Sequence, residues 1–276
     1  MISATTRVAA VIGSPVRHSL SPALHNAGFA ATGVDWVYTA FVVEPGGARA
    51  ALDAMRIFGF GGLSVTMPHK GDVAALVDEL DAAAAALRSV NTVVPIGDGR
   101  LKGYSTDGAG FLASLAAHGV EVEGKRVCVL GGGGAARAIV DALARAGAVG
   151  VTVVNRSQER AAAAAALAEG VGVVGQPDAI ADCDILVNAT SIGMGSTELP
   201  CDPQMLHDGQ VVADIIYHPR STALLAAARD RGARTVEGLG MLVHQAVVQQ
   251  QLWTGRSVDP AVMWAAAERE LASRGQ

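Results

Sequence analysis

Short apolar runs alternate along the chain with longer stretches in which hydrophobic and polar residues recur at helical spacing. The short β-rich runs predict strands at 7–12, 36–43, 61–67, 92–96, 101–104, 126–130, 151–154, 171–174, 185–188, 211–215 and 234–236. The longer stretches predict helices at 22–33, 46–58, 70–77, 78–87, 108–118, 135–146, 161–166, 239–253 and 260–271. This order of strand and helix is typical of an α/β fold with mostly parallel sheets.

The pattern is interrupted once, by two predicted strands that are separated only by the turn GDGR at 97–100. It restarts with the helix at 108–118, so we expect two domains that meet near residue 105. No charged or proline-rich linker marks the boundary. The last two helices have no partner strand, and from the pattern alone they could cover either domain.

A run of four glycines links one predicted strand to the next helix, in RVCVLGGGGAARA at 126–138. Gly131, Gly133 and Ala136 fit the G-x-G-x-x-A form of the dinucleotide fingerprint. The first glycine permits a tight turn, the second lets a pyrophosphate approach the backbone, and the small third residue lets helix pack on strand. The helix N-terminus then presents N–H groups to the phosphates. Four glycines in a row are also compatible with a simple flexible turn.

The residues after the next strand bear on the kind of cofactor. That strand ends in Asn155, Arg156 and Ser157, and it closes a β-α-β unit of about the thirty residues that the fingerprint requires. A carboxylate here usually accepts the ribose 2′-hydroxyl of NAD, whereas a guanidinium favours the 2′-phosphate of NADP. Arg156, with Arg160 one turn later, therefore predicts NADP. The alternative is that Arg156 is a solvated charge at a strand end.

The composition narrows the class of protein. Of the 276 residues, 50% are hydrophobic and 17% are charged, so the chain can bury a sizeable core. The net charge of -5, without a basic block, argues against nucleic acid as a partner. No apolar run approaches the roughly 20 residues of a membrane span, and no signal-peptide pattern is present, so we expect a cytoplasmic protein. The three cysteines are too widely spaced for a metal site and predict buried free thiols.

Polar residues gather at two predicted strand ends in the first half of the chain. Ser19 and Ser21 precede a helix, where two hydroxyls can point at one carboxylate; the alternative is that Ser21 is an N-cap. Lys70 follows a buried strand and a proline turn, where a lysine is not easily a solvated surface charge. The alternative is that it is solvated, as most lone lysines are.

Two further polar positions follow. Asn91, in SVNT, offers both a hydrogen-bond donor and an acceptor. Thr106 and Asp107 stand at the entry to a helix, where simple N-capping is the alternative to a role in chemistry.

Together with the glycine loop, these clusters make the chain resemble the shikimate dehydrogenases. The resemblance extends over nearly the whole chain in order, so it is far more specific than any one motif. The matching motifs are S-x-S-P-x-x-H-N at 19–26, V-T-x-P-x-K at 65–70, N-T at 91–92, T-D-G at 106–108, GGGGAAR at 131–137, N-R-S at 155–157, NATSIGM at 188–194, Y-x-P-x-x-T at 217–222 and GLGMLVHQA at 238–246.

The resemblance implies an α/β protein with two domains, an N-terminal substrate-binding domain (1–105 with 239–276) and a Rossmann NADP-binding domain (106–238). Substrate would lie in the cleft between them, with the C-terminal helices packing back over it. The implied reaction is the reversible NADPH-dependent reduction of 3-dehydroshikimate to shikimate, a step of aromatic amino-acid biosynthesis. Oligomeric state would be monomer or homodimer.

The resemblance also assigns roles to individual residues. Lys70 and Asp107 would be the catalytic pair, and no metal is expected. Contacts to the substrate carboxylate or ring hydroxyls would come from Ser19, Ser21, Thr66, Asn91, Tyr217 and Gln245. Contacts to NADP(H) would come from Gly131, Gly132, Gly133, Gly134, Ala135, Asn155, Arg156, Ser157, Arg160, Thr190, Gly238 and Met241.

The chemistry agrees with the role given to the lysine. When hydride reaches a ketone carbon the oxygen becomes an alkoxide, and an ammonium within hydrogen-bond reach supplies a proton and stabilises the charge. Burial would lower the pKa of Lys70 and a charged Asp107 would raise it, so the sequence predicts the role of this lysine but not its pKa.

Two residues depart from the family pattern. Ser64 and Ser105 stand where many members have asparagine, which leaves the preferred ring acid open. The alternatives are a quinate/shikimate or aminoshikimate dehydrogenase, with NAD as a possible cofactor, and a noncatalytic NADPH-binding regulatory protein. His18, His25 and His69 lack metal-ligand spacing and are interpreted as packing residues or residues behind the site.

Overall fold

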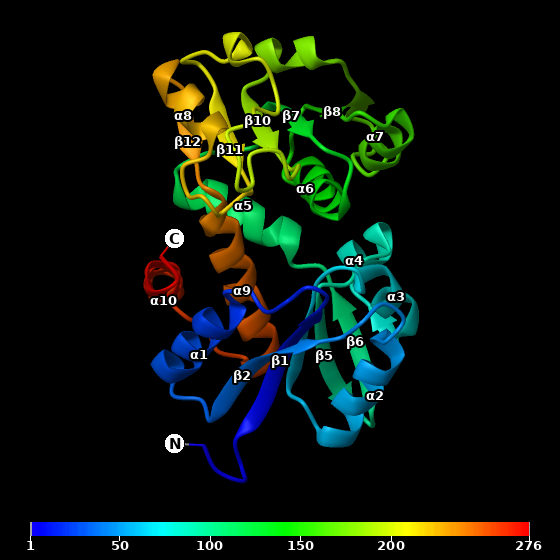
Figure 1. Cartoon of the computed structure of the whole chain (residues 1–276). Helices are drawn as coiled ribbons and strands as arrows, with labels where there is room; N and C mark the ends of the chain where they lie inside the picture. The colour runs from blue at the N-terminus through cyan, green and yellow to red at the C-terminus, as the bar shows by residue number, and fades with distance from the viewer. Residues whose placement is uncertain (1, 276) are drawn as a thin grey trace. The chain divides into compact units, whose positions relative to one another are not determined.

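The structure is a computed structural model that describes residues 2–275, and it divides into two compact units (Figure 1). The first unit contains residues 2–106 and 245–275, and the second contains residues 107–244. Each unit has its own sheet and its own hydrophobic core.

The sheet of the first unit has six strands in the order β2-β1-β3-β5-β6-β4. β1 pairs in parallel with β2 and β3, whereas β5 is antiparallel to both β3 and β6. The turn between β5 and β6 is the predicted GDGR, in which Gly97, Asp98 and Gly99 all have positive φ. The strands are β1 (Arg7–Gly13), β2 (Trp36–Val42), β3 (Gly62–Val65), β4 (Glu79–Leu80), β5 (Thr92–Gly97) and β6 (Arg100–Tyr104).

Helices bury both faces of this sheet. Alternate residues of β1 enter different clusters: Ala10 and Ile12 pack with residues of α2, whereas Ala9 and Val11 pack with Trp253 of α9. This is why the strand is apolar at every position after Arg7 rather than at every second one. The helices of this unit are α1 (Ser21–Thr32), α2 (Ala48–Phe58), α3 (Lys70–Leu76), α4 (Ala82–Leu87), α9 (Gly238–Thr254) from its residue 245 onward, and α10 (Pro260–Ser273), which packs on α1.

The second unit is a doubly wound parallel sheet in the order β12-β11-β10-β7-β8-β9. β7 is central, and the strand order reverses between β7 and β10, which is the arrangement of a Rossmann fold. The strands are β7 (Arg126–Leu130), β8 (Gly150–Val154), β9 (Gly172–Val174), β10 (Ile185–Asn188), β11 (Val211–Asp214) and β12 (Arg234–Val236). The helices are α5 (Asp107–Ala117), α6 (Gly134–Arg145), α7 (Gln158–Ala165) and α8 (Ala223–Asp230), with 3-10 turns η1 (Pro177–Asp182) and η2 (Pro203–Met205).

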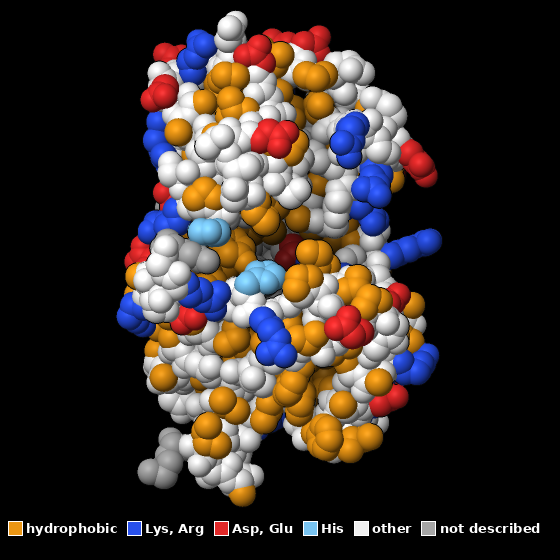
Figure 2. Space-filling model, viewed as in Figure 1, with side chains coloured by type: hydrophobic (Ala, Val, Ile, Leu, Met, Phe, Trp, Pro, Cys, Tyr) orange, Lys and Arg blue, Asp and Glu red, His pale blue; other side chains and the backbone are white. Residues whose placement is uncertain are grey.

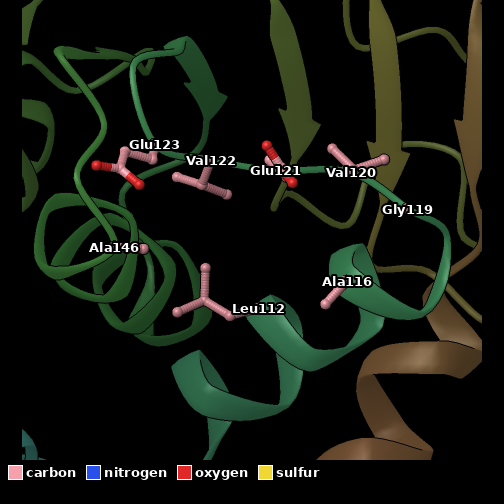
Figure 3. A pocket seen from close by; sticks show the side chains of 8 residues that line it. All are labelled: Leu112, Ala116, Gly119, Val120, Glu121, Val122, Glu123 and Ala146. Carbon is pink, nitrogen blue, oxygen red and sulfur yellow. The ribbon is translucent and has the colours of Figure 1, made fainter.

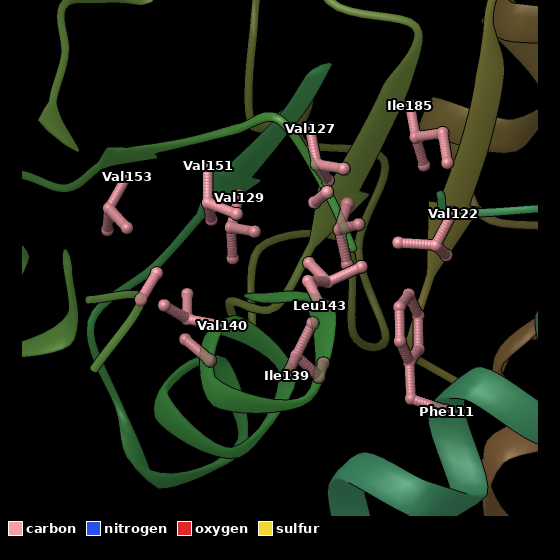
Figure 4. Packing of buried hydrophobic residues seen from close by; sticks show 14 of the residues in the cluster. Phe111, Val122, Val127, Val129, Ile139, Val140, Leu143, Val151, Val153 and Ile185 are labelled. Atoms are coloured by element: carbon pink, nitrogen blue, oxygen red, sulfur yellow. The ribbon is translucent and has the colours of Figure 1, made fainter. Parts of the chain in front are cut away.

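One face of the second sheet packs on α5 and α6. In Figure 4 the side chains of Ile139 and Leu143 point toward the valines of the sheet, and the ring of Phe111 points toward Val122. The opposite face contains the thiols of Cys128 and Cys183. Both are free and buried, as predicted, whereas Cys201 is only half-buried. A hydrogen bond with Cys183, together with burial, raises the pKa of Cys128, so this thiol is not a reactive one.

The predicted helix at 78–87 is wrong in its first four residues. Asp78 and Asp81 are bound along β6, since the backbone N–H of Leu101 donates to the Asp78 carboxylate (2.7 Å) and the N–H of Asp81 donates to Gly103 (2.9 Å). The helix begins at Ala82, where the Asp81 side chain caps it. None of the described helices is both long and apolar enough to cross a bilayer.

Candidate active site

Three loops of the first unit meet at one edge of its sheet. The N–H of Val65 donates to the Asn91 carbonyl (2.8 Å) and the N–H of Thr66 donates to Ile12 (3.0 Å). The N–H of Ser14 donates to the carbonyl of Met67 (3.0 Å). The end of β1, the lysine turn and the segment that contains Asn91 are therefore held together by backbone hydrogen bonds, and the loop that leads to Ser19 and Ser21 begins at the same edge.

Ser21 is not an N-cap. It is the first residue of α1, the cap is Leu20, and no side chain caps the helix. The Ser21 hydroxyl instead acts on the phenol of Tyr38, whose pKa it lowers against the rise caused by burial. The N–H of Ser21 donates to the hydroxyl of Ser19 (3.2 Å). Arg274 of α10 donates to the carbonyls of His18 (2.7 Å) and Ser19 (3.3 Å), so the loop before α1 is fixed in place.

Lys70 opens α3 and is half-buried, so it differs from a fully solvated lysine. Its carbonyl accepts from the N–H of Val90 (2.9 Å), which places the turn directly beside the segment that contains Asn91. His69 anchors the same turn, because it is buried and its Nε2 hydrogen-bonds to the carbonyl of Val43 (2.7 Å). Thr66, at the end of β3, is half-buried in the same turn.

Asn91 is buried, and the orientation of its amide is set by two donors. Its Oδ1 accepts from the N–H of Thr106 (2.9 Å) and from the hydroxyl of Thr92 (2.9 Å), while its Nδ2 donates to the Thr106 hydroxyl (3.0 Å). Asp107 is the next residue after Thr106, opens α5 and is half-buried. The asparagine therefore fixes the residue that precedes the predicted catalytic carboxylate.

Gln245 lies on the side of α9 that faces β5. Gln249, one turn further along the helix, donates from Nε2 to the Thr92 hydroxyl (2.8 Å) and to the Asn91 carbonyl (3.3 Å). Residues four apart share a helix face. Gln245 therefore belongs to the same neighbourhood of the first unit as Asn91.

The glycine turn of the second unit follows the dinucleotide fingerprint position by position. Gly131 has φ of 118°, and a Cβ there would lie 2.8 Å from the carbonyl oxygen of Ala189. Ala136 is fully buried where α6 packs on the sheet. Gly133 caps α6 without a side chain, and a Cβ there would meet nothing within 4 Å. The open space at Gly133, at a helix N-terminus, fits a phosphate group.

Two arginines lie beside this turn. A Cβ on Gly132 would be 2.9 Å from the Cβ of Arg160, so Arg160 is in contact with the glycine loop. Arg156 and Arg160 are both exposed, and within residues 2–275 neither forms an ion pair. Ser157 caps α7 through the N–H of Arg160 (3.3 Å), and Asn155 donates to the Ser157 carbonyl (3.0 Å). Two unpaired guanidinium groups at a phosphate loop fit NADP.

The remaining predicted cofactor residues surround the ends of β10 and β11. Thr190 lies next to Gly131, and its hydroxyl donates to the Oδ1 of Asn188 (2.7 Å). Gly238 is packed so tightly that a Cβ would lie 2.4 Å from the backbone of Ile215. Met241, on α9, packs against the core of this unit.

Asp214 is a structural residue of the second unit that the sequence did not indicate. Its buried carboxylate accepts from Asn188 Nδ2 (3.1 Å), from the N–H of Ile216 (3.0 Å) and from the Thr222 hydroxyl (2.7 Å). Burial raises its pKa, and these hydrogen bonds oppose the rise. The carboxylate thus ties the NATSIGM motif to the segment that carries Tyr217, which is half-buried.

Comparison with known proteins identifies the family. Three family models match: shikimate dehydrogenase substrate binding domain at residues 11–93, shikimate/quinate 5-dehydrogenase at 114–198, and shikimate 5′-dehydrogenase C-terminal domain at 238–268. The shikimate dehydrogenases (NADP(+)) of Rubrobacter xylanophilus and Moorella thermoacetica are 44% and 43% identical to the chain. The alignments cover 99% and 95% of this chain and 98% and 92% of those proteins. The chain belongs to the shikimate dehydrogenase family.

The solved structures similar to this shikimate dehydrogenase family member are of enzymes with different named activities. The shikimate 5-dehydrogenase of Thermus thermophilus, in complex with NADP(H) and shikimate, matches with a TM-score of 0.90 and 34% identity over 95% of this chain and 99% of that one. The 5-ketofructose reductase of Gluconobacter sp. strain CHM43 matches at 0.89 and 36%, over 97% and 100%. The quinate dehydrogenase of Corynebacterium glutamicum, in complex with NAD, matches at 0.89 and 33%, over 96% and 99%.

The second unit also has a groove of about 550 Å³ that is not lined by any of the residues predicted to bind substrate or cofactor. Its lining includes Leu112 and Ala116 of α5, which face the segment 119–123 across it (Figure 3). None of the predicted site residues is among the eight that line it, and Glu121 and Glu123 make its rim acidic. Such a rim is unsuited to the phosphates of a dinucleotide.

Charged side chains of both signs lie on the face of this shikimate dehydrogenase family member that is drawn in Figure 2. Several Lys and Arg side chains follow one another along its right edge.

The histidines and one departure from the family pattern have clear places in the structure. His25 and His69 are buried packing residues, whereas His18 is exposed. Ser64 is buried, and its hydroxyl is bonded to Tyr38 and Gln249. Sequence reasoning missed Tyr38 and Gln249; the only signal was the polar triplet QQQ at 249–251 within an otherwise apolar helix.

Proposed function

We propose that the protein catalyses the reversible NADP-dependent interconversion of 3-dehydroshikimate and shikimate. The observation that carries this proposal is that the Lys70 turn and the Asn91 segment are bonded together at the end of β1, where the loop that leads to Ser19 and Ser21 begins, in a chain 44% identical to a shikimate dehydrogenase (NADP(+)). A protein that only bound a nucleotide would have no use for a half-buried lysine held beside a buried carboxamide. We further expect it to act in the cytoplasm, as a monomer or homodimer.

NADP(H) would be held by the second unit. The N-terminus of α6 and the bare backbone of 131–134 would receive the pyrophosphate, and Arg156 with Arg160 would receive the 2′-phosphate. Thr190, Gly238 and Met241 would border the rest of the cofactor. When bound, NADPH supplies a hydride to the ketone carbon of the substrate.

The substrate would be recognised by polar groups of known position within each unit. Ser19, whose carbonyl is held by Arg274 of α10, and Ser21, whose N–H donates to Ser19, would donate hydroxyl hydrogen bonds to the carboxylate. Thr66, Asn91 and Gln245 of the first unit, and Tyr217 of the second, would contact the carboxylate or the ring hydroxyls.

Lys70 and Asp107 would move the proton. As the ketone is reduced, the Lys70 ammonium donates a proton to the oxygen that develops negative charge, and it accepts that proton in the reverse direction. Asp107 orients the ammonium and the reacting hydroxyl. Asn91 assists by holding Thr106, the neighbour of Asp107.

Dehydrogenation of quinate is the second candidate, because a solved quinate dehydrogenase is 33% identical to the chain. Quinate shares the ring carboxylate and hydroxyls that the serines and Asn91 would bind. Aminoshikimate as substrate, or a noncatalytic NADPH-binding role, finds no comparable support in these contacts.

The test is an absorbance assay of NADP⁺ and NAD⁺ reduction with shikimate and with quinate, run in parallel on the purified full chain. We expect the largest kcat/KM with shikimate and NADP⁺, and about a tenfold or greater preference over NAD⁺, because charge-assisted hydrogen bonds to the 2′-phosphate are lost with NAD⁺. Higher kcat/KM with quinate would move the assignment to quinate dehydrogenase. No reduction with either acid would refute both.

A further inference from the structure

A directed chain of hydrogen bonds crosses the interior of the first unit. The Tyr38 hydroxyl donates to Ser64 Oγ (2.6 Å), and the Ser64 hydroxyl donates to Gln249 Oε1 (2.9 Å). Gln249 Nε2 donates to Thr92 Oγ1 (2.8 Å), and the Thr92 hydroxyl donates to Asn91 Oδ1 (2.9 Å). All five side chains are buried, so none of these groups can exchange its partner for bulk water.

This chain of hydrogen bonds runs from Tyr38 to Asn91, and Asn91 is predicted to bind substrate. At the Tyr38 end the hydroxyl of Ser21, which is expected to hold the carboxylate, acts on the Tyr38 phenol and lowers its pKa against the effect of burial. At the other end the Asn91 amide cannot turn over, because its Oδ1 accepts from both Thr92 and Thr106. Gln249 is the only amide between the two ends, and it joins α9 to β3 and β5.

The surroundings of Gln249 fix which of its amide atoms accepts. His25 lies with its Nε2 3.2 Å from Gln249 Oε1 and its ring stacked on Tyr38 at 4.3 Å. Burial lowers the pKa of His25 to about 3, so the ring is neutral. The carbonyl of Asn91 can only accept, and Gln249 Nε2 donates to it (3.3 Å), so Nε2 points toward β5. Oε1 is therefore the acceptor for Ser64 and for the Nε2 hydrogen of His25.

Ser64 and Gln249 fit each other in length. A side chain longer than serine at position 64 would collide with Tyr38 and Gln249, whose atoms lie 2.6 Å and 2.9 Å from the serine oxygen. A shorter side chain at position 249 would leave the Ser64 and Thr92 hydroxyls without the amide that links them. The serine that departs from the family pattern is thus matched to a glutamine on another element.

We propose that Ser64 and Gln249 are a coupled pair of positioning residues that sets the orientation of Ser21 and Asn91 toward the ring acid. The proposal rests on the function proposed above. Neither residue touches substrate; they act through Tyr38 and Thr92, and their effect is on how well shikimate is held rather than on NADP⁺ binding.

The test uses Ser64→Ala, Gln249→Ala and the double variant of the full chain. We expect each single substitution to raise the KM for shikimate about tenfold, with kcat changed less than about threefold and the KM for NADP⁺ unchanged, as for loss of ground-state contacts. Because both substitutions break the same chain of hydrogen bonds, the double variant should be no worse than Gln249→Ala alone. Multiplied effects in the double variant would overturn the proposal.

Gln250→Ala is the matched control. Gln250 lies on the same helix and is fully buried, but its Nε2 donates to Thr32, away from the chain of hydrogen bonds. We expect it to lower the melting temperature about as much as Gln249→Ala while leaving the KM for shikimate unchanged. An equal rise in KM for Gln250→Ala would reduce the role of Gln249 to general stability and end the proposal.

The design separates this proposal from the proposed function. A wild-type protein that does not oxidise shikimate refutes the function by itself. The coupling of the pair is still measured by the melting temperatures of the same three variants, which need no substrate. Losses in melting temperature that simply add would then refute the pairing.

Discussion

Among single residues, Lys70 is distinguished by its place at the first turn of α3, beside the segment that contains Asn91. Lys70→Met should lower kcat by about two to four orders of magnitude, because the alkoxide then has no general acid. The rise in melting temperature on adding NADP⁺ should be preserved, since the glycine loop belongs to the other unit. Stopped assays and thermal shift measure the two quantities.

The control for this substitution is Lys125→Met, which removes an exposed lysine from the second unit. It should retain wild-type turnover. A Lys70→Met variant with more than about a tenth of the wild-type kcat would contradict the proton-transfer role.

The two arginines beside the glycine loop lead to a prediction about cofactor choice. Arg156→Ala combined with Arg160→Ala should raise the KM for NADP⁺ about tenfold to a hundredfold, because charge-assisted hydrogen bonds to the 2′-phosphate are lost. The KM for NAD⁺ should change less than about threefold. Equal changes for both cofactors would show that the arginines stabilise the loop instead of reading the phosphate.

The serines and the asparagine show how far residue-level prediction could go. The motif spacing indicated Ser19, Ser21 and Asn91 because the two serines stand at the start of a helix and Asn91 stands directly before a strand. It could not indicate that Ser21 acts on the phenol of Tyr38 instead of capping its own helix, because Tyr38 lies on another element, 17 positions along the chain. Gln249 was missed for the same reason: its partners are brought to it only by the fold.

At the scale of elements, the glycine turn contains two glycines with different physical demands. Gly133→Ala should leave the fold intact, at a cost below about 1 kcal/mol, because a Cβ there meets no protein atom within 4 Å and φ is −83°. The added methyl would occupy the space expected for the pyrophosphate. The KM for NADP⁺ should therefore rise about tenfold or more, with an unchanged melting temperature in the absence of cofactor.

Gly131→Ala provides the contrast. Its φ of 118° and the Ala189 carbonyl 2.8 Å from the added Cβ should together cost about 1–3 kcal/mol of stability, visible without cofactor. Gly150→Ala, in β8, has its nearest neighbour 4.0 Å from the new Cβ and serves as a neutral control. Equal stability losses at 131 and 133 would contradict this division of roles.

The central strands of the second unit, β7 and β10, were predictable because they are buried at nearly every position and read as almost continuous apolar runs. β4 was not, because its two residues are half-buried and owe their extended form to pairing with β6. Helix α8 also escaped prediction, although Thr222 caps it by accepting from the N–H of Leu225 (3.3 Å). Thr222 was interpreted only as the last residue of the Y-x-P-x-x-T motif, so its role as a helix N-cap was missed.

At the scale of the whole molecule, the two units carry separate cores, and all three tryptophans (Trp36, Trp253 and Trp264) belong to the first. Tryptophan fluorescence therefore reports unfolding of the first unit alone. The same unit buries His25 completely, with its Nε2 directed at Gln249 and its ring packed against Tyr38 and Trp253.

This histidine makes the stability of the first unit sensitive to acid. Burial lowers its folded-state pKa to about 3 from the ordinary 6.5, so between these values the unfolded chain binds a proton that the folded chain does not. Its contribution is fully present above about pH 6.5 and is lost as pH falls toward 3, by up to about 1.4 kcal/mol for each pH unit.

The prediction is that His25→Gln removes this pH dependence from the first unit. The measurement is urea unfolding, followed by tryptophan fluorescence, between pH 4.5 and 7.5, which spans about two pH units of the predicted loss. The free energy of unfolding should fall more steeply with acid in the wild type than in the variant. The difference in slope should correspond to the uptake of about one proton on unfolding. The glutamine amide can still donate to Gln249 but cannot titrate. Any cost of the substitution is therefore independent of pH and only displaces the variant's curve of unfolding free energy against pH. Parallel curves would show that the buried ring is not the group that acid must charge.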